Sequence, residues 1–261
     1  MKTLLAAAIL LMVFVSCKTY KVALPGNLIS TSEKLHVKGT GISVFGHKIN
    51  VEGFGEGRMY SGFTFNSSTD KRLFPLYFDL DRRMNYISNH FSKQIDRTKT
   101  KFNFEFASNG VYANTYCMAR TTQTSLDMKS SGMNIGLSEN YTFDGVIFTN
   151  KIDEPWRISF SGSKDIKEGL KDIFGNVRNT NGLLTNDSVE IAINQVYYTN
   201  KKNKDGLLKI PLGFEFIRDN KVIAFIDAFK NDIYISKEVD DHTRLILVSA
   251  ATSVLVKTRA S

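Results

Sequence analysis

The chain has 261 residues and a formal net charge of +8, from 34 lysines and arginines against 26 aspartates and glutamates. Hydrophobic residues make up 42% and charged residues 23%, which excludes a disordered, collagen-like or polytopic membrane chain. Two cysteines exclude a disulfide framework. With 19 phenylalanines, 10 tyrosines and only 4 prolines, the chain is suited to bury an aromatic-rich core.

The first 17 residues predict an export signal. Lys2 supplies a basic start, and residues 4–15 form an unbroken apolar run, shorter than the roughly 20 residues needed to cross a bilayer. The run ends in Phe14-Val15-Ser16-Cys17, and polar residues follow at once. An ordinary signal peptide with an incidental cysteine is one interpretation of this ending.

The ending also resembles the signal of bacterial lipoproteins, in which a small residue precedes a cysteine that is lipidated and becomes the mature N-terminus. Phe14 departs from that pattern, which prefers an aliphatic residue. The resemblance implies a signal peptide over residues 1–16, lipidation of Cys17 and a lipidated tether over residues 17–34. A single β-rich domain then covers residues 35–261. The expected location is the bacterial cell envelope, on the outer membrane, facing the periplasm or the cell surface.

From residue 35 onward the hydrophobic period is two, as in strands with one buried face. Phe102, Phe104 and Phe106, for example, alternate with polar residues. Strands are predicted at residues 42–51 (a hairpin turning near 45–47), 73–80, 99–107, 141–149, 156–161, 189–193, 207–217, 222–229 and 232–236. Turns are predicted at Asn109-Gly110, Asp144-Gly145, Asn181-Gly182, Asp205-Gly206 and Asp219-Asn220. The fold class predicted is mainly β, an antiparallel β-barrel or sandwich of about ten to twelve strands.

Three segments have helical spacing instead. Residues 163–175 run from a possible N-cap, Ser163, to a terminating glycine. For residues 82–97 a helix and a β-strand are both open interpretations. The third, about residues 239–257, opens with acidic residues and is apolar on almost every side. Such a helix has to be buried, and its apolar part, residues 245–256, is too short to cross a membrane. We therefore expect it inside the β-structure or tightly covered by it.

Before the acidic turn and the apolar helix, the end of the chain has three short β patterns: Phe214-Glu215-Phe216, Val222-Ile223-Ala224 and Ile233-Tyr234-Ile235. With the helix that follows them, they resemble the end of the tubby-like barrel superfamily. The resemblance is one of pattern and includes no diagnostic motif. It implies a twelve-stranded barrel that encloses a C-terminal helix, and a function at membranes. A sandwich with a packed helix is the alternative.

No motif predicts a cofactor, a metal site or a catalytic nucleophile. The four histidines lack ligand spacing: His36, His47, His90 and His242. Asp240-Asp241-His242 stands at a helix start, so capping explains it better than a metal does. The glycines of residues 53–57 indicate strand bends, because further β pattern follows them. Cys117 is expected to be a buried, inert core thiol.

Carboxylates support an enzymatic alternative, a hydrolase acting on envelope polysaccharide or peptide. Two suitably spaced acids are the minimum machinery of a glycosidase. The candidates are Glu52, Glu56, Asp79, Asp81 and Glu105. Because a chain of period two always places some acids on one face, exposed strand or turn positions are the simpler interpretation.

The basic excess predicts weak contact with an anionic surface. Arg82-Arg83 and the cluster Lys201, Lys202 and Lys204 are the candidate residues, each lysine or arginine adding ~1 kcal/mol near a charged membrane. Nucleic acid is an improbable partner for an exported protein. The leading prediction is a membrane-anchored envelope lipoprotein with a non-catalytic binding or structural role. Its partner would be an envelope lipid, glycan or protein.

Overall fold

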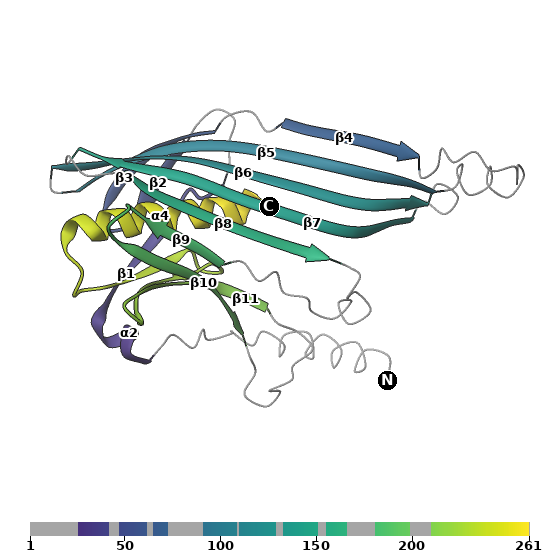
Figure 1. The fold of residues 1–261 in the computed structure, drawn as a ribbon. Coiled ribbons are helices and arrows are strands. Elements are labelled where there is room, and N and C mark those ends of the chain that lie inside the picture. Colours follow the sequence, from purple (N-terminus) through teal and green to yellow (C-terminus); the bar gives the residue numbers. More distant parts are fainter. Residues whose placement is uncertain are drawn as a thin grey trace, which may run out of the picture.

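The computed structural model describes residues 26–41, 47–61, 65–72, 91–108, 110–128, 133–150, 155–165, 181–198 and 210–260. Their strands form one antiparallel sheet in the order β3-β2-β1-β13-β12-β11-β10-β9-β8-β7-β6-β5-β4. Because β3 also pairs with β5, twelve strands close into a barrel, and β4 is an extra strand on β5 (Figure 1). The mainly β prediction is confirmed, as a barrel and not a sandwich.

Almost every strand pairs with its neighbour in the chain, so the barrel is largely a succession of hairpins. The strands are β1 (Ser32–Lys38), β2 (His47–Val51), β3 (Gly55–Ser61), β4 (Phe65–Arg72), β5 (Phe91–Ser108), β6 (Val111–Met128), β7 (Met133–Thr149), β8 (Trp156–Asp165), β9 (Asn181–Thr185), β10 (Glu190–Tyr198), β11 (Ile210–Arg218), β12 (Lys221–Asp227) and β13 (Asp232–Ser236). The described helices are α2 (Gly26–Thr31) and α4 (Asp241–Ala260).

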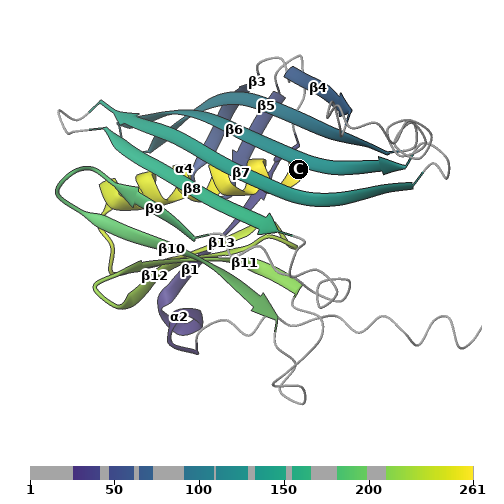
Figure 2. The ribbon, with the colours of Figure 1, turned by 45° about the vertical axis from the view of Figure 1, so that its right-hand side comes forward.

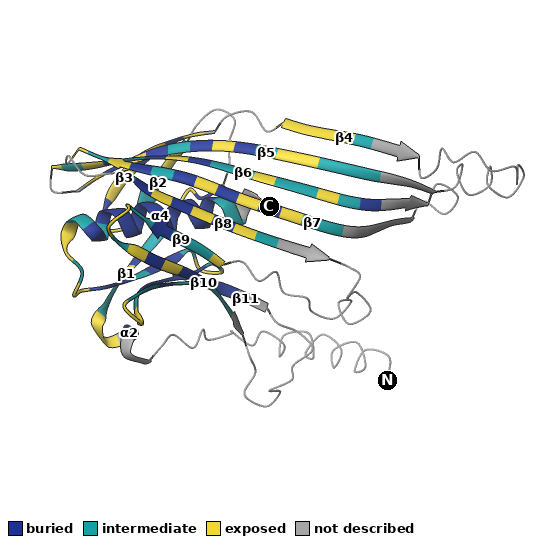
Figure 3. Cartoon of the chain, in the orientation of Figure 1, coloured by how far each residue is buried: buried dark blue, intermediate teal, exposed yellow. Residues whose placement is uncertain are grey.

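Alternation along the strands sorts side chains between the barrel interior and its outer wall. On β5, Phe102, Phe104 and Phe106 are buried, while Lys101 and Glu105 between them are exposed. The same alternation of buried and exposed positions runs along β6, β7 and β8 (Figure 3). Since successive strand residues point to opposite faces, the apolar period of two supplies most of the inner lining on these strands.

The helix α4 occupies the interior of the barrel. It lies between the wall formed by β5–β8 and the wall formed by β10–β13 (Figure 2). Each residue from 245 to 256 is at most 1% exposed, whichever side of the helix it is on. The predicted burial of this all-round apolar helix is therefore confirmed, and the surrounding strands provide the apolar partners that it needs.

Asp240 caps the start of α4. Its Oδ1 accepts hydrogen bonds from the backbone N–H groups of His242 (3.1 Å) and Thr243 (3.0 Å), and its Oδ2 accepts one from the Thr243 hydroxyl (2.6 Å). Burial acts to raise the pKa of Asp240, but the hydrogen bonds from Thr243 and His242 outweigh it, so the pKa lies below its ordinary value. The capping interpretation of residues 240–242 is thus confirmed.

Removing this cap should weaken the domain. We expect Asp240→Ala to lower the free energy of unfolding by about 1 kcal/mol, and Asp240→Asn, which keeps an accepting oxygen, to cost less. Because folding depresses the Asp240 pKa, its charge stabilises the protein above the unfolded-state pKa, and this stabilisation fades as pH falls through both pKa values. Urea unfolding at pH 7 and at about pH 3 measures the difference. An Asp240→Ala deficit of equal size at both pH values would contradict this account.

Where the structure can be compared, the helix predicted at residues 163–175 is wrong, and of the two interpretations of residues 82–97 the β interpretation is the correct one. Residues 91–97 belong to β5, where they pair with β4 on one side and β6 on the other. Residues 163–165 end β8 and pair with β7. Backbone pairing to long neighbouring strands prevails there over local helical spacing. Residues 82–90 and 166–175 lie outside the described residues.

Two predicted turns are also wrong. Asp144-Gly145 lies inside β7, and Asn181-Gly182 begins β9. Both glycines serve close packing: a Cβ on Gly145 would lie 2.7 Å from Ile158 Cγ2, and one on Gly182 would lie 2.5 Å from the Phe160 ring. By contrast, Asp219-Asn220 does connect β11 to β12, with φ values of 51° and 60°. The turn at Gly110, between β5 and β6, is likewise confirmed.

The folded part begins earlier than the predicted boundary at residue 35. β1 starts at Ser32, and α2 packs beside β12 and β13 before it, so only residues 17–25 of the expected tether remain outside the described fold. Residues 42–46, which hold the first strand and most of the turn of the hairpin expected near residues 45–47, lie outside the described residues, and His47 starts β2. A tight connection joins β2 and β3 at residues 52–54. The strand predicted at residues 73–80 and the Asp205-Gly206 turn fall outside the described residues.

Candidate binding surface

The residues predicted for the anchor and for anionic contact lie outside the described residues. They are Cys17, Arg82, Arg83, Lys201, Lys202 and Lys204. Among the described basic residues, Lys101 is exposed on β5 and Lys99 is half-buried on the same strand. The site therefore has to be built from other side chains.

Cys117 is a core residue of β6, as predicted. Its Sγ donates a hydrogen bond to Ser253 Oγ of α4 at 3.4 Å, and that hydroxyl donates to the Ser249 carbonyl at 2.8 Å. Burial raises the pKa of the Cys117 thiol to about 12, although the hydrogen bond with Ser253 works in the opposite direction. The thiol stays protonated at neutral pH, so it makes a poor nucleophile.

The candidate acids occupy solvent-facing positions. Glu52 is exposed in the β2–β3 turn, and Glu105 is exposed on the outer wall of β5. Glu56 on β3 accepts a hydrogen bond from Lys48 Nζ at 2.8 Å, which lowers the pKa of Glu56. Asp79 and Asp81 lie outside the described residues. None of the three described acids lines the groove identified below.

Sequence reasoning missed two buried carboxylates that face each other across β12 and β13. Asp232 accepts from Lys34 Nζ at 2.9 Å and from His36 Nδ1 at 2.8 Å, which ties β1 to β13 and raises the pKa of Lys34. Asp227 accepts from the backbone N–H groups of Phe229 and Lys230, both at 3.1 Å. Asp232 therefore links strands β1 and β13, and Asp227 holds the turn between β12 and β13. Within the described ranges, no cluster of three His, Cys, Asp or Glu residues is arranged to hold a metal.

Five exposed aromatic side chains lie on the outer wall around β5 and β6. We call them the aromatic face: Tyr60, Phe65, Tyr112, Tyr116 and Phe148. Each is between 47% and 69% exposed. Tyr60 and Tyr116 both stand opposite Asn103, from the two strands that flank β5. The rings of Tyr116 and Phe148 meet edge to face, with centroids 6.1 Å apart. Such a concentration of exposed rings marks a candidate contact surface.

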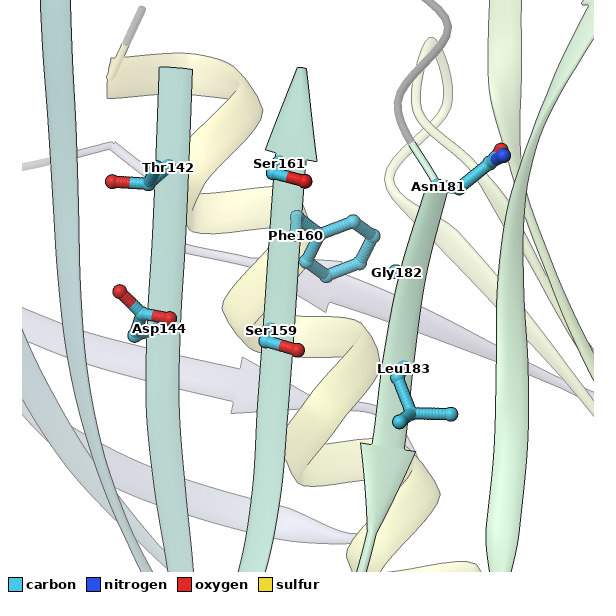
Figure 4. Close-up of a pocket in the computed structure, with 8 residues that line it drawn as sticks. All are labelled: Thr142, Asp144, Ser159, Phe160, Ser161, Asn181, Gly182 and Leu183. Atoms are coloured by element: carbon cyan, nitrogen blue, oxygen red, sulfur yellow. The ribbon is translucent and has the colours of Figure 1, made fainter.

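Beside the aromatic face, strands β7, β8 and β9 form a shallow polar groove of about 310 Å³. Six outward side chains line it in two cross-strand rows, Thr142–Ser161–Asn181 and Asp144–Ser159–Leu183 (Figure 4). The ring of Phe160 reaches from β8 toward Gly182 and completes the lining with it. Because Gly182 has no side chain, the ring can lie directly over the β9 backbone.

The groove and the aromatic face are continuous. Tyr116 stands opposite Val146, which is two residues from Asp144 on the same face of β7. Arg120 stands opposite Thr142, and Arg157 stands opposite Val146, so cations flank both ends of the junction. The sequence could assign these residues to the polar face of their strands. It could not reveal their neighbours, because those depend on the pairing register.

Compared with known proteins, the chain matches no family, no curated protein and no solved structure. The barrel around a C-terminal helix has the architecture that the tubby-like resemblance implied, and membership in that superfamily stays a prediction. Among the described residues, no helix has the length and apolar character required to span a bilayer.

Proposed function

We propose that this chain is a lipid-anchored protein of the bacterial cell envelope with a non-catalytic binding role. The observation that carries the proposal is a barrel whose interior is taken up by its own helix. Residues 245–256 of α4 are at most 1% exposed, so the place for a partner is the outer wall. The polar groove and the aromatic face supply such a place on β3, β4 and β6–β9.

The enzymatic alternative has less support. A glycosidase needs two carboxyl groups on either side of the bond that it cleaves. Asp144 is the single carboxylate among the eight residues that line the groove. Glu215 on β11 has a pKa raised by burial, but it does not line the groove either. A binding role requires only hydrogen bonds and stacking contacts from these side chains.

The anchor is tested by expressing the full chain in a bacterial host and fractionating the cells. We expect the mature N-terminal peptide to begin at Cys17 and to carry acyl chains, and the protein to partition with membranes. Several acyl chains, at ~0.8 kcal/mol for each buried CH₂, would hold it there almost permanently. Cys17→Ser should abolish both the added mass and the partitioning of the mature domain. The matched control is Cys117→Ser, which should leave anchoring unchanged. A mature Cys17→Ser protein that still partitions with membranes would exclude the anchor.

A further inference from the structure

We infer that the polar groove and the adjoining aromatic face together bind a saccharide chain of the envelope. This inference rests on the proposed binding role and names the chemical class of its ligand. It follows from the lining of the groove, the spacing of the aromatic rings and the position of α2 on the barrel.

The groove displays the hydrogen-bonding groups that sugar hydroxyls need. Thr142, Ser159 and Ser161 supply hydroxyls that both donate and accept, Asn181 supplies an amide that does the same, and Asp144 accepts only. Within the described part of the chain, these five side chains form no hydrogen bonds with one another or with other side chains. Toward the described residues their hydrogen-bonding capacity is unused, and it suits a ligand rich in hydroxyl groups. The volume, about 310 Å³, falls within the range of about 300–1,000 Å³ typical of small-ligand sites.

The aromatic face supplies the apolar part of such a site. Sugar rings expose C–H faces that stack on aromatic rings, while their hydroxyls point sideways to polar groups. Tyr60 and Tyr116 are separated by one strand, and strands lie about 4.8 Å apart, so their backbones are about 10 Å apart. That spacing is close to the length of a disaccharide in an extended chain. Asn103 lies between them with an amide for hydrogen bonding.

The position of α2 favours a glycan over the headgroups of the anchoring membrane. The helix packs beside β12 and β13, and the sheet order places β6 half-way round the barrel from there (Figure 2). Fully extended, residues 17–25 reach about 30 Å, nearly the same as half the circumference of twelve strands, about 29 Å at the backbone. A tether shorter than its fully extended length therefore keeps an anchor at Cys17 on the α2 side of the barrel, which favours an orientation with the aromatic face toward the envelope space.

Chitohexaose in its N-acetylated form, an uncharged chain of six β-linked N-acetylated amino sugars, is the soluble probe, and purified peptidoglycan sacculi are the insoluble one. We expect the mature full chain to bind both, in calorimetric titration and in co-sedimentation respectively. The double variant Asp144→Ala/Asn181→Ala should raise the Kd for chitohexaose roughly tenfold or more, since two hydrogen bonds are lost. Tyr116→Ala should weaken binding similarly. The matched control, Glu238→Ala/Asn66→Ala, removes one carboxylate and one amide from exposed positions outside the groove and should leave the Kd unchanged.

The outcomes separate the saccharide from other occupants. Failure of the wild-type chain to bind either probe would overturn the inference, as would binding that the groove variants leave unchanged while their circular dichroism stays native. Binding to anionic phospholipid vesicles that Asp144→Ala/Asn181→Ala abolishes, without saccharide binding, would overturn the saccharide and keep the binding role. Cleavage of chitohexaose would instead overturn the non-catalytic role. Cys17→Ser should not change the Kd, so loss of the anchor is distinguishable from loss of the site.

Discussion

Leu247→Asp is expected to abolish folding of the barrel. Leu247 is 0% exposed at the middle of α4, inside the closed sheet, and apolar residues surround it on the helix. An unpaired carboxylate there has to be desolvated or protonated, at a cost of several kcal/mol. A domain of this kind has only about 5–15 kcal/mol of stability in total. The variant should therefore be insoluble or should lack cooperative thermal unfolding.

Leu247→Met is the matched control for that experiment. It keeps the volume and the apolar character of the side chain, so we expect a loss below about 1.5 kcal/mol. Circular dichroism and thermal unfolding of both variants make the comparison. If Leu247→Asp unfolded at the same temperature as the wild type, the helix would not be the core of the barrel.

Gly213→Ala should destabilise the domain at a second point, the β11–β12 ladder. A Cβ on Gly213 would lie 1.6 Å from the carbonyl oxygen of Ile226, which is backbone and cannot rotate away. The strands would have to separate where they are hydrogen-bonded, next to the pair Phe214–Ile226. We expect a loss of about 3 kcal/mol, at the upper end of what overpacking normally costs.

Gly41→Ala is the matched control, because nothing lies within 4 Å of the added Cβ at that position. The change should stay within about 0.5 kcal/mol of the wild type. Urea unfolding gives the midpoints and slopes of all three proteins. Equal midpoints for Gly213→Ala and the wild type would mean that β11 and β12 do not pair in this register.

The features that the sequence predicted are those that a local pattern encodes. Alternation around Phe104 predicted a strand with one buried face, and apolar residues on every side of α4 predicted a buried helix. The cap at Asp240 was predictable because its donors are only two and three residues away. Each of these features depends on neighbours close in the chain.

The features that the sequence did not predict depend on residues far apart in the chain. Gly145 and Gly182 read as turn glycines, yet each is required by a side chain on β8, Ile158 or Phe160. For residues 91–97 the sequence left a helix and a strand open, because the two partner strands cannot be seen in the spacing of this segment. The groove could not be predicted for the same reason. Its two rows of side chains cross β7, β8 and β9, and the register that aligns these strands is not encoded in the pattern of any one of them.

A crystal structure of the mature protein grown with chitohexaose gives the most direct test of binding on the outer wall of a filled barrel. We expect sugar density in the polar groove, against Asp144 and Asn181, with a ring stacked on Tyr116 and α4 unmoved inside the barrel. Ligand density inside the barrel, with α4 displaced, would contradict the account.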